Sequence, residues 1–228
     1  MKKYLVTLGF AFISICISAQ TLSRITITNN TNADIISFED QTLVINITEE
    51  GSVINWGTKY SGPNRNIYSQ ERLEKYMGRE EYYAQSENEA CRGKIKYIGR
   101  VSLTYYTDEE DKDLKGKIKS IGNQRVEYYN AYIDIAVKGK VKTIGNTSFT
   151  YYLSFDDVAY KGKLRSVGET ALIYYSSFDD KVLKGKIKSI NGSVFTYYSS
   201  YDRREYSGSL KSGARELYFN GIYYYLRN

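Results

Sequence analysis

The 228-residue chain contains no histidine, one proline and only two cysteines. The missing histidine removes the commonest general base and the commonest metal ligand of proteins. Cys16 falls in an N-terminal apolar segment, so Cys91 is the cysteine expected in the mature chain, where it has no internal disulfide partner. We expect Cys91 to be half-buried and without a functional role, with a free reactive thiol or an intermolecular disulfide as the alternatives. Stability must then come from burial and strand pairing.

Residues 1–19 have the pattern of a secretory signal peptide. Lys2 and Lys3 precede an apolar segment at 4–17, and Ala19 provides a small residue at the cleavage point. The segment is too short and wrongly flanked for a membrane anchor, and no later run approaches the roughly 18 apolar residues of a spanning helix. The pattern, which is typical of bacteria, predicts a secreted or periplasmic protein, for which nucleic acid is not an expected partner.

A 23-residue unit recurs along most of the chain, from about residue 92 to residue 213. It reads approximately K-G-K-I-K-S-I-G-N, three variable residues, T-Y-Y, then F-D-D and an apolar residue. A fixed period of this length indicates a repeat architecture. Glycine recurs once in each unit at Gly93, Gly116, Gly139, Gly162, Gly185 and Gly208, and a tyrosine pair begins at Tyr105, Tyr128, Tyr151, Tyr174 and Tyr197.

Alternation of side chains places the first strand of each unit. Over 138–145 it puts Lys138, Lys140 and Lys142 on one face and Val141 on the other. The lysines of successive units are therefore expected to form columns on one face of a sheet.

Two turns complete each unit. Gly145-Asn146 begins the first turn, residues 149–155 form the return strand, and Asp156-Asp157 forms the second turn because aspartate caps its own backbone. Each unit is then one β-hairpin, and successive hairpins join into an antiparallel meander.

A parallel β-solenoid with one coil per unit is the rival architecture. It would stack equivalent lysines at roughly 4.8 Å, where like charges repel by about 1 kcal/mol per neighbour even in water. In the meander the repeat distance doubles to roughly 10 Å, about one Debye length. The lysine columns therefore favour the meander.

Three regions follow the signal segment. Residues 20–68 contain short β-branched runs separated by turn residues, which predict a small N-terminal β region. Residues 69–91 are a degenerate repeat or linker: Tyr82-Tyr83 lies one unit length before the next tyrosine pair, although residues 70–77 could form a short helix instead. Residues 92–228 form the hairpin-repeat domain of about six hairpins, and Asn220-Gly221 marks a last hairpin. The expected fold is all-β, an elongated twisted sheet.

The opening of the unit resembles the MORN repeat, a 23-residue β-hairpin that begins with an aromatic or aliphatic residue followed by x-Gly. The residues concerned are Tyr160-Lys161-Gly162, Leu183-Lys184-Gly185 and Tyr206-Ser207-Gly208, and the likeness covers about residues 91–213. Where the MORN pattern has a second G-x-G, this chain has Phe, Thr or Tyr followed by Tyr. The resemblance implies a single elongated sheet used for membrane-lipid contact or self-association.

Charge divides unevenly along the chain. Residues 20–91 carry 6 Lys/Arg and 11 Asp/Glu, whereas residues 92–228 carry 24 and 15. The imbalance indicates either an anionic partner for the repeats or an internal match between the two parts. The candidate binding surface is a lysine and tyrosine face made of Lys117, Lys119, Lys140, Lys142, Lys163, Arg165, Lys186, Lys188, Tyr129, Tyr152, Tyr175 and Tyr198.

Each feature of that face has a structural alternative. Lysines keep the solvent-exposed face of a sheet soluble and discourage pairing between the edges of two sheets. Tyrosine pairs suit a thin sheet, because each side chain can bury its ring and expose its hydroxyl to solvent. The functional alternative is an aromatic row that binds carbohydrate. The aspartate pairs favour turns over calcium sites, since no known calcium pattern accompanies them.

The sequence thus predicts a non-catalytic protein of the cell envelope without a cofactor or metal. Its expected partner is an anionic polysaccharide, a lipid surface or an envelope protein. The alternative is a structural protein that assembles with copies of itself.

Overall fold

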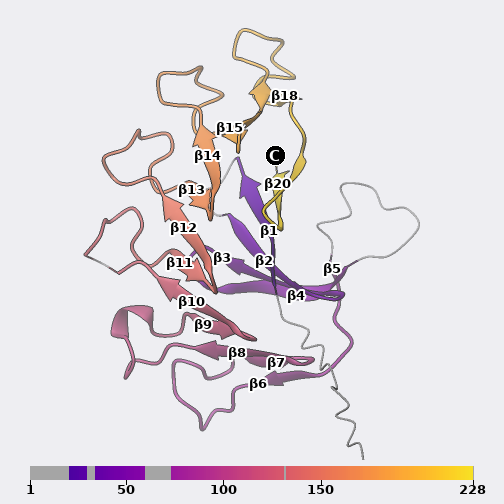
Figure 1. Cartoon of the computed structure of the whole chain (residues 1–228), viewed down its shortest axis with the longest axis vertical. Coiled ribbons are helices and arrows are strands. Elements are labelled where there is room, and N and C mark those ends of the chain that lie inside the picture. The colour runs from indigo at the N-terminus through magenta and orange to yellow at the C-terminus, as the bar shows by residue number, and fades with distance from the viewer. Residues whose placement is uncertain (1–20, 30–33, 60–72, 131, 228) are drawn as a thin grey trace, which may run out of the picture.

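The computed structural model describes residues 21–29, 34–59, 73–130 and 132–227, and these residues form an all-β protein (Figure 1). The helical content of the described residues is a single 3-10 turn at Lys112–Leu114, so no described helix has the length to cross a membrane. The signal segment lies outside the described residues. The short helix considered over 70–77 is not formed in its described part, which begins with strand β5 (Leu73–Glu74).

The repeats form an open sheet of eleven strands in which each strand pairs antiparallel with its neighbour in the chain. This confirms the predicted meander and rules out the solenoid. A two-stranded pair continues the series beyond Phe195. The repeat sheet consists of β6 (Glu80–Tyr82), β7 (Ile95–Ile98), β8 (Val101–Tyr105), β9 (Ile118–Ile121), β10 (Gln124–Tyr128), β11 (Val141–Ile144), β12 (Thr147–Tyr151), β13 (Leu164–Val167), β14 (Thr170–Tyr174), β15 (Ile187–Ile190) and β16 (Ser193–Val194), followed by the pair β17 (Thr196–Tyr197) and β18 (Leu210–Ser212).

The first turn of each unit is the one that the sequence predicts. Ile144 pairs with Thr147 across Gly145-Asn146, and Gly145 has a φ of 54°. That left-handed conformation favours glycine, which has no Cβ to clash. The two-residue turn holds the hairpin in register.

A β-bulge in each unit changes which side chains share a face. In β11, Thr143 pairs with Glu127 but Val141 pairs with Tyr128, so Lys142 is the extra residue. Val141 and Ile144 are both buried although they lie three residues apart. Bulges insert one residue in this way and locally break the two-residue alternation. The same register shift recurs at Tyr105, Tyr151, Tyr174 and Tyr197.

The return strand is shorter than predicted. The expected strand 149–155 ends at Tyr151, and the chain then forms a loop that runs to Leu164. Asp156 stops the strand pairing because its carboxylate accepts a hydrogen bond from the Leu153 N–H at 2.6 Å. Phe155 is therefore a loop residue, and 81% of it is exposed.

A second sheet, here called the N-terminal sheet, joins both ends of the described chain. The hairpin at Asn220-Gly221 forms as predicted, but it belongs to this sheet and not to the repeat region that the sequence analysis extended to residue 228. Its last strand pairs parallel with β1, and the other neighbours are antiparallel. The order is β19 (Glu216–Phe219), β20 (Ile222–Arg227), β1 (Thr21–Thr28), β2 (Ile35–Asp40), β3 (Leu43–Thr48), β4 (Val53–Lys59) and β5.

Strand β6 makes residues 80–103 a first, irregular repeat. It pairs with β7 with the same register shift as later units, and the Tyr83 hydroxyl donates to the Leu103 carbonyl as its later counterparts do.

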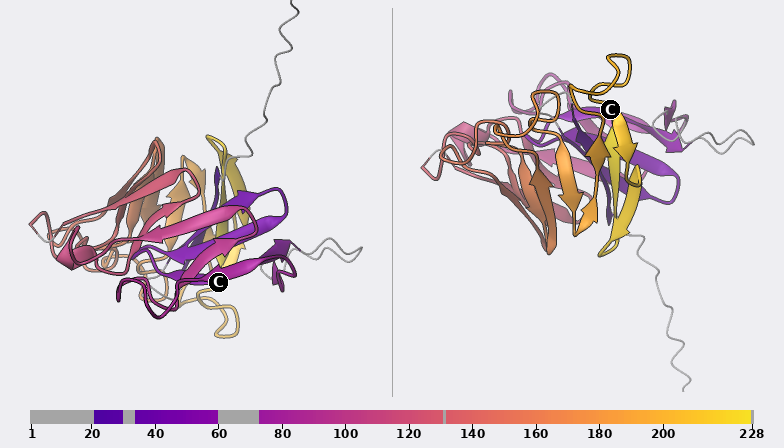
Figure 2. Two further views of the ribbon diagram at one scale, coloured as in Figure 1. Left: turned by 90° about the horizontal axis from the view of Figure 1, so that it is seen from below. Right: turned by 90° about the horizontal axis from the view of Figure 1, so that it is seen from above.

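The two sheets share one hydrophobic core. The repeat sheet forms an arc from β6 to β18, and the N-terminal sheet lies inside that arc, while the long loops point outward (Figures 1 and 2). Buried Ile25, Ile36 and Phe38 of the N-terminal sheet pack in one cluster with Ile118 and Phe149 of the repeats. Cys91 is a free cysteine in this core, more buried than the half-buried position expected. Backbone bonds also link the sheets, as in Val141 N–H to Glu49 O at 2.7 Å.

Candidate functional site

The structure separates the cations of the predicted binding face into two rows. The inner row comprises the second lysine of each K-G-K, that is Lys94, Lys117, Lys140, Lys163 and Lys186. The outer row comprises the cation two residues later, that is Lys96, Lys119, Lys142, Arg165, Lys188 and Lys211. Each inner-row ammonium lies over the first tyrosine of a pair, at 4.9–5.5 Å from the ring centre.

The inner row is tied into the fold. Lys117 donates to the Gly139 carbonyl at 2.8 Å, Lys140 donates to the Gly162 carbonyl at 2.7 Å, and Lys94 makes the same bond to Gly116. Each bond links one repeat to the next. Lys94, Lys117 and Lys140 therefore act first as links between repeats.

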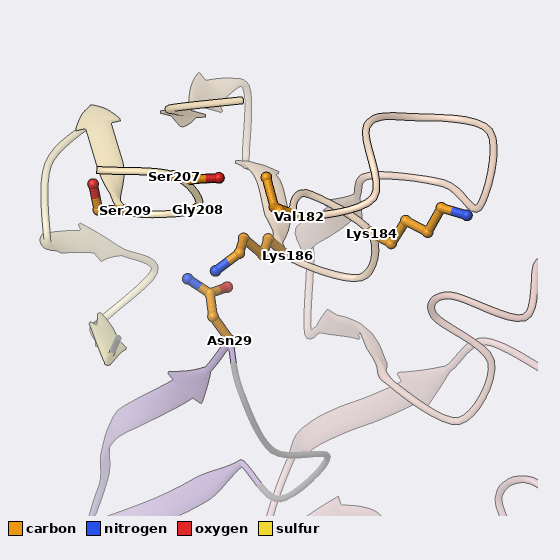
Figure 3. Close-up of a pocket in the computed structure, with 7 residues that line it drawn as sticks. All are labelled: Asn29, Val182, Lys184, Lys186, Ser207, Gly208 and Ser209. Carbon is orange, nitrogen blue, oxygen red and sulfur yellow. The ribbon is translucent and has the colours of Figure 1, made fainter. Parts of the chain in front are cut away.

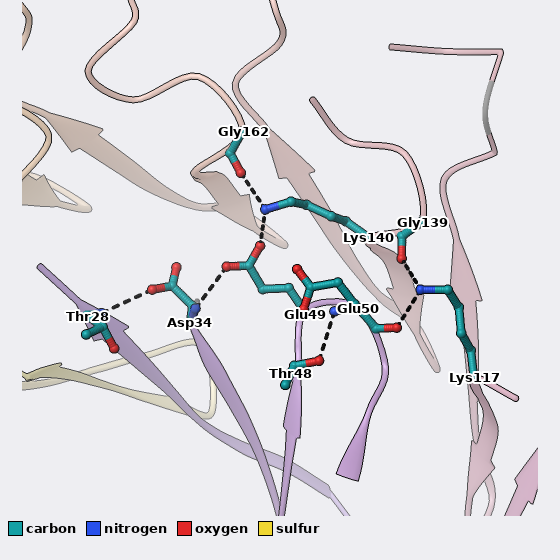
Figure 4. Close-up of polar contacts among 9 residues, drawn as sticks. All are labelled: Thr28, Asp34, Thr48, Glu49, Glu50, Lys117, Gly139, Lys140 and Gly162. Carbon is teal, nitrogen blue, oxygen red and sulfur yellow. Dashed lines mark hydrogen bonds and ion pairs between the residues drawn. The ribbon is translucent and has the colours of Figure 1, made fainter. Parts of the chain in front are cut away.

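The N-terminal sheet covers the middle of the inner row (Figure 4). Lys140 Nζ lies 2.5 Å from Glu49 Oε2, and only 13% of the Lys140 side chain and 2% of the Glu49 side chain are exposed. Lys117 also donates to the Glu50 carbonyl at 2.7 Å. Of the two explanations for the charge imbalance, the internal match between the two parts describes this row.

Two buried carboxyl groups lie behind Lys140. The Asp34 N–H donates to Glu49 Oε1 at 2.9 Å, and the Thr28 N–H donates to Asp34 Oδ1 at 3.1 Å. Burial raises the pKa of Asp34 to about 6 and that of Glu49 to about 7, and the neighbouring lysines offset only part of this effect. Burial likewise lowers the pKa of Lys163.

Two tyrosine hydroxyls in the same region differ from their counterparts. Tyr105 and Tyr128 donate to the carbonyls of Ile95 and Ile118 at 2.9 and 2.7 Å. The equivalent hydroxyls of Tyr151 and Tyr174 are buried and have no hydrogen-bond partner among the described residues. Burial raises the pKa of both phenols well above the ordinary value, so they are neutral.

Five of the six outer-row cations, all except Lys142, lie over the second tyrosine of a pair. Arg165 lies 5.5 Å from the Tyr152 ring centre, and Lys188 lies 5.2 Å from that of Tyr175. The rings before the last repeat are fixed, because each hydroxyl from Tyr83 to Tyr175 donates to a carbonyl of the next repeat, as Tyr152 does to Leu172 at 3.0 Å. Half-buried Tyr152, Tyr175 and Tyr198 thus carry a cation over the ring and are not open stacking surfaces. Tyr129 is also half-buried, and its hydroxyl donates to the Phe149 carbonyl.

The outer row changes character along the arc. In the early repeats its lysines are paired, Lys96 with Glu87 at 3.1 Å and Lys119 with Glu110. In the later repeats Lys142, Arg165, Lys188 and Lys211 are exposed and form no ion pair with a described acidic residue. The later half of the array therefore presents a row of exposed cations without ion pairs, of which Lys188 and Lys211 still attract the nearby carboxylates of Asp179 and Asp202.

Lys211 was not among the predicted site residues, although its position one unit length after Lys188 marks it as a member of the column. The last unit replaces K-G-K by S-G-S, which obscured the match.

Lys186 ends the inner row beside this unit, at a hollow of about 580 Å³ lined by Asn29, Val182, Lys184, Ser207, Gly208 and Ser209. Lys186 and Asn29 point toward each other there (Figure 3), and burial lowers the Lys186 pKa.

No family model, curated protein or solved structure matches this chain. Among the described residues, no group of three or more cysteine or acidic side chains is placed to hold a metal ion.

Proposed function

We propose that this chain is a non-catalytic binding protein that engages an anionic surface or polymer through the later half of the outer row. The observation that carries the proposal is the set of four exposed cations, Lys142, Arg165, Lys188 and Lys211, which no described acid neutralises within ion-pair distance. Lys117 and Lys140 of the inner row are not part of this surface, because internal contacts already occupy them.

The spacing of these cations suits an extended ligand. Equivalent residues of successive hairpins lie two strands apart, which is roughly 10 Å. A row of like charges at that spacing attracts a polyanion or an anionic membrane over its whole length, and salt screens the attraction. The tyrosine rings beneath Arg165, Lys188 and Lys211 restrict these side chains, which lowers the entropy that binding must remove. The MORN-like opening of the unit is consistent with surface contact.

The test is co-sedimentation of the mature protein with phosphatidylglycerol vesicles and, separately, affinity electrophoresis in polygalacturonate, both from low to high salt. The outer-row variant carries Lys142→Glu, Arg165→Glu, Lys188→Glu and Lys211→Glu. A matched control carries Lys112→Glu, Lys138→Glu, Lys161→Glu and Lys184→Glu, which are exposed loop lysines with the same change in net charge.

The expected result is salt-sensitive binding that the outer-row variant loses and the loop control largely keeps. Equal losses in both variants would show that net charge alone matters. Absence of binding to both anionic probes, with the wild-type protein folded, would refute the proposal. We also propose that the protein works outside the cytoplasm, which N-terminal sequencing of the mature chain would test.

Self-assembly is the second candidate function, and the open repeat sheet supports it. Strand β6 is the edge of an eleven-stranded sheet and pairs on one side only within the described chain. Unpaired strand edges are templates for pairing with another chain. Concentration-dependent association in analytical ultracentrifugation, insensitive to salt and blocked by Glu81→Pro, would favour this function.

A further inference from the structure

Four aromatic side chains at one position of the repeat are almost wholly in water. This tip row comprises Tyr132, Phe155, Phe178 and Tyr201, which are 93, 81, 95 and 94% exposed and occupy the same position in successive units. Single exposed apolar residues are common on protein surfaces. Four in register, on four successive outer loops, are not explained by packing, because none of them belongs to the core.

The loops that carry the tip row are braced against one another. Asp157 accepts hydrogen bonds from the Ser177 N–H at 3.0 Å and from the Ser177 hydroxyl at 2.8 Å. Asp180 holds Ser200 in the same way at 3.0 and 2.7 Å, and Asp134 holds Ser154. Each bond reaches from one loop to the next, so the ladder fixes the spacing of the rings.

The row is suited to a chain-like ligand and not to a flat one. Successive hairpins are two strands apart, so the loop bases are roughly 10 Å apart. The loops fan outward along the arc of the sheet (Figure 1). A planar surface would reach only neighbouring tips, whereas a polymer could follow all four.

The charge of the tips argues against a polyanion or an anionic membrane. Of the loop segments 129–136, 152–159, 175–182 and 198–205, the first three carry net negative charge and the fourth is neutral, and the exposed lysines Lys138, Lys161 and Lys184 follow the first three segments. Hydrogen bonds to serine and backbone N–H groups lower the pKa of Asp134, Asp157 and Asp180, which therefore stay ionised near neutral pH. The tips thus differ in charge from the cationic outer row.

We propose that the tip row binds a neutral linear polysaccharide. Sugar rings present apolar C–H faces that pack on aromatic rings, and sugar hydroxyls can donate to the neighbouring carboxylates, which are strong acceptors. The ligand lies across the loop tips, with one aromatic ring per repeat against one sugar face. This site is separate from the outer row and goes beyond the proposed function.

The experiment is native affinity electrophoresis of the mature protein in gels with hydroxyethylcellulose, galactomannan, laminarin or dextran, followed by calorimetry with the polymer that retards it. Each single substitution Phe155→Ala or Phe178→Ala is expected to weaken binding by roughly two- to tenfold, the contribution of one aromatic contact. The variant with all four tip residues changed to Ala should lose retardation, and Phe178→Trp should retain it.

Two controls keep the outcome clear. Tyr218→Ala removes an aromatic ring that is 59% exposed on the N-terminal sheet and should leave retardation unchanged. The outer-row Glu variant should also bind these neutral polymers normally, so loss of the proposed anionic binding and loss of tip binding are distinguishable. Because the tip rings are exposed, thermal unfolding of the tip variants should match that of the wild-type protein.

Three results would overturn the proposal. The first is no retardation in any of the four neutral polymers. The second is retardation that survives the fourfold tip variant. The third is that the tip variant loses vesicle binding or self-association instead, which would assign the rings to a membrane or to a second copy of the chain.

Discussion

Lys140 and Lys142 lie two residues apart in one repeat and have opposite surroundings. Lys140 is half-buried, bridges two repeats and pairs with Glu49 of the N-terminal sheet. Lys142 is the extra residue of a β-bulge, is exposed, and pairs with no described acid. Both positions recur once in each repeat. Periodicity alone therefore does not distinguish a structural lysine from one free to bind a ligand; the sheet that covers one of them does.

The comparison predicts a large difference in stability. Lys140→Ala should lower the free energy of unfolding by about 3 kcal/mol, because it leaves the buried Glu49 carboxyl without its cation. Lys142→Ala should change it by less than about 0.5 kcal/mol, as expected for an exposed residue. Urea denaturation of both variants measures the two values.

A double variant sharpens this prediction. Lys140→Met with Glu49→Gln removes both charges and keeps most of the volume, so it should be more stable than Lys140→Ala alone. Equal stability of Lys140→Ala and Lys142→Ala would contradict the division into two rows.

The buried acids near the inner row should give the protein an unusual dependence on pH. Since the folded pKa values of Asp34 and Glu49 lie above their unfolded values, the folded state binds more protons than the unfolded state between about pH 4 and pH 7. Stability should therefore rise by roughly 3 kcal/mol as the pH falls from 7 to 5. Glu49→Gln should flatten the slope in a series of urea titrations.

A profile that falls steadily from pH 7 to pH 5 in the wild-type protein would refute this account. Below that window the tip-loop aspartates act in the opposite direction. Their folded pKa values are lowered, so the stability that they contribute is lost as the pH falls through those values.

The smallest expected effect separates tyrosines within the inner face. Tyr174→Phe should raise stability by about 1 kcal/mol, because it removes a buried hydroxyl that has no described partner. Tyr128→Phe should lower it by about 1 kcal/mol, because it removes the bond to the Ile118 carbonyl. Thermal unfolding of the two variants should shift in opposite directions, and shifts of the same sign would contradict this difference.

The local features of the fold could be predicted from the sequence. Gly145-Asn146 and Asn220-Gly221 signal their turns directly, and the 23-residue period predicts the hairpin meander. The bulge at Lys142 could not be foreseen, because a strict two-residue alternation puts Lys140 and Lys142 on the same face. Phe155 was placed in a strand because the role of Asp156 in closing the loop is visible only in three dimensions.

The pairings between segments that are distant in the chain also could not be predicted from the sequence. Nothing in residues 216–227 indicates that β20 lies parallel to β1, and nothing in residues 34–50 indicates that Glu49 faces Lys140. Contacts between distant segments do not produce a periodic pattern in the amino-acid sequence. The candidate site was therefore found as a set of cations, and only the structure divides that set into two rows.

The pairing of β20 with β1 has a consequence for the order in which the protein is made. Strand β1 cannot complete its pairing until β20 is present, and β20 is synthesised after all the repeats. Until then one edge of β1 is open, and contacts that span most of a chain form slowly. A nascent chain interrupted before residue 222 would carry all the lysine rows and yet lack the strand that completes the sheet inside the arc.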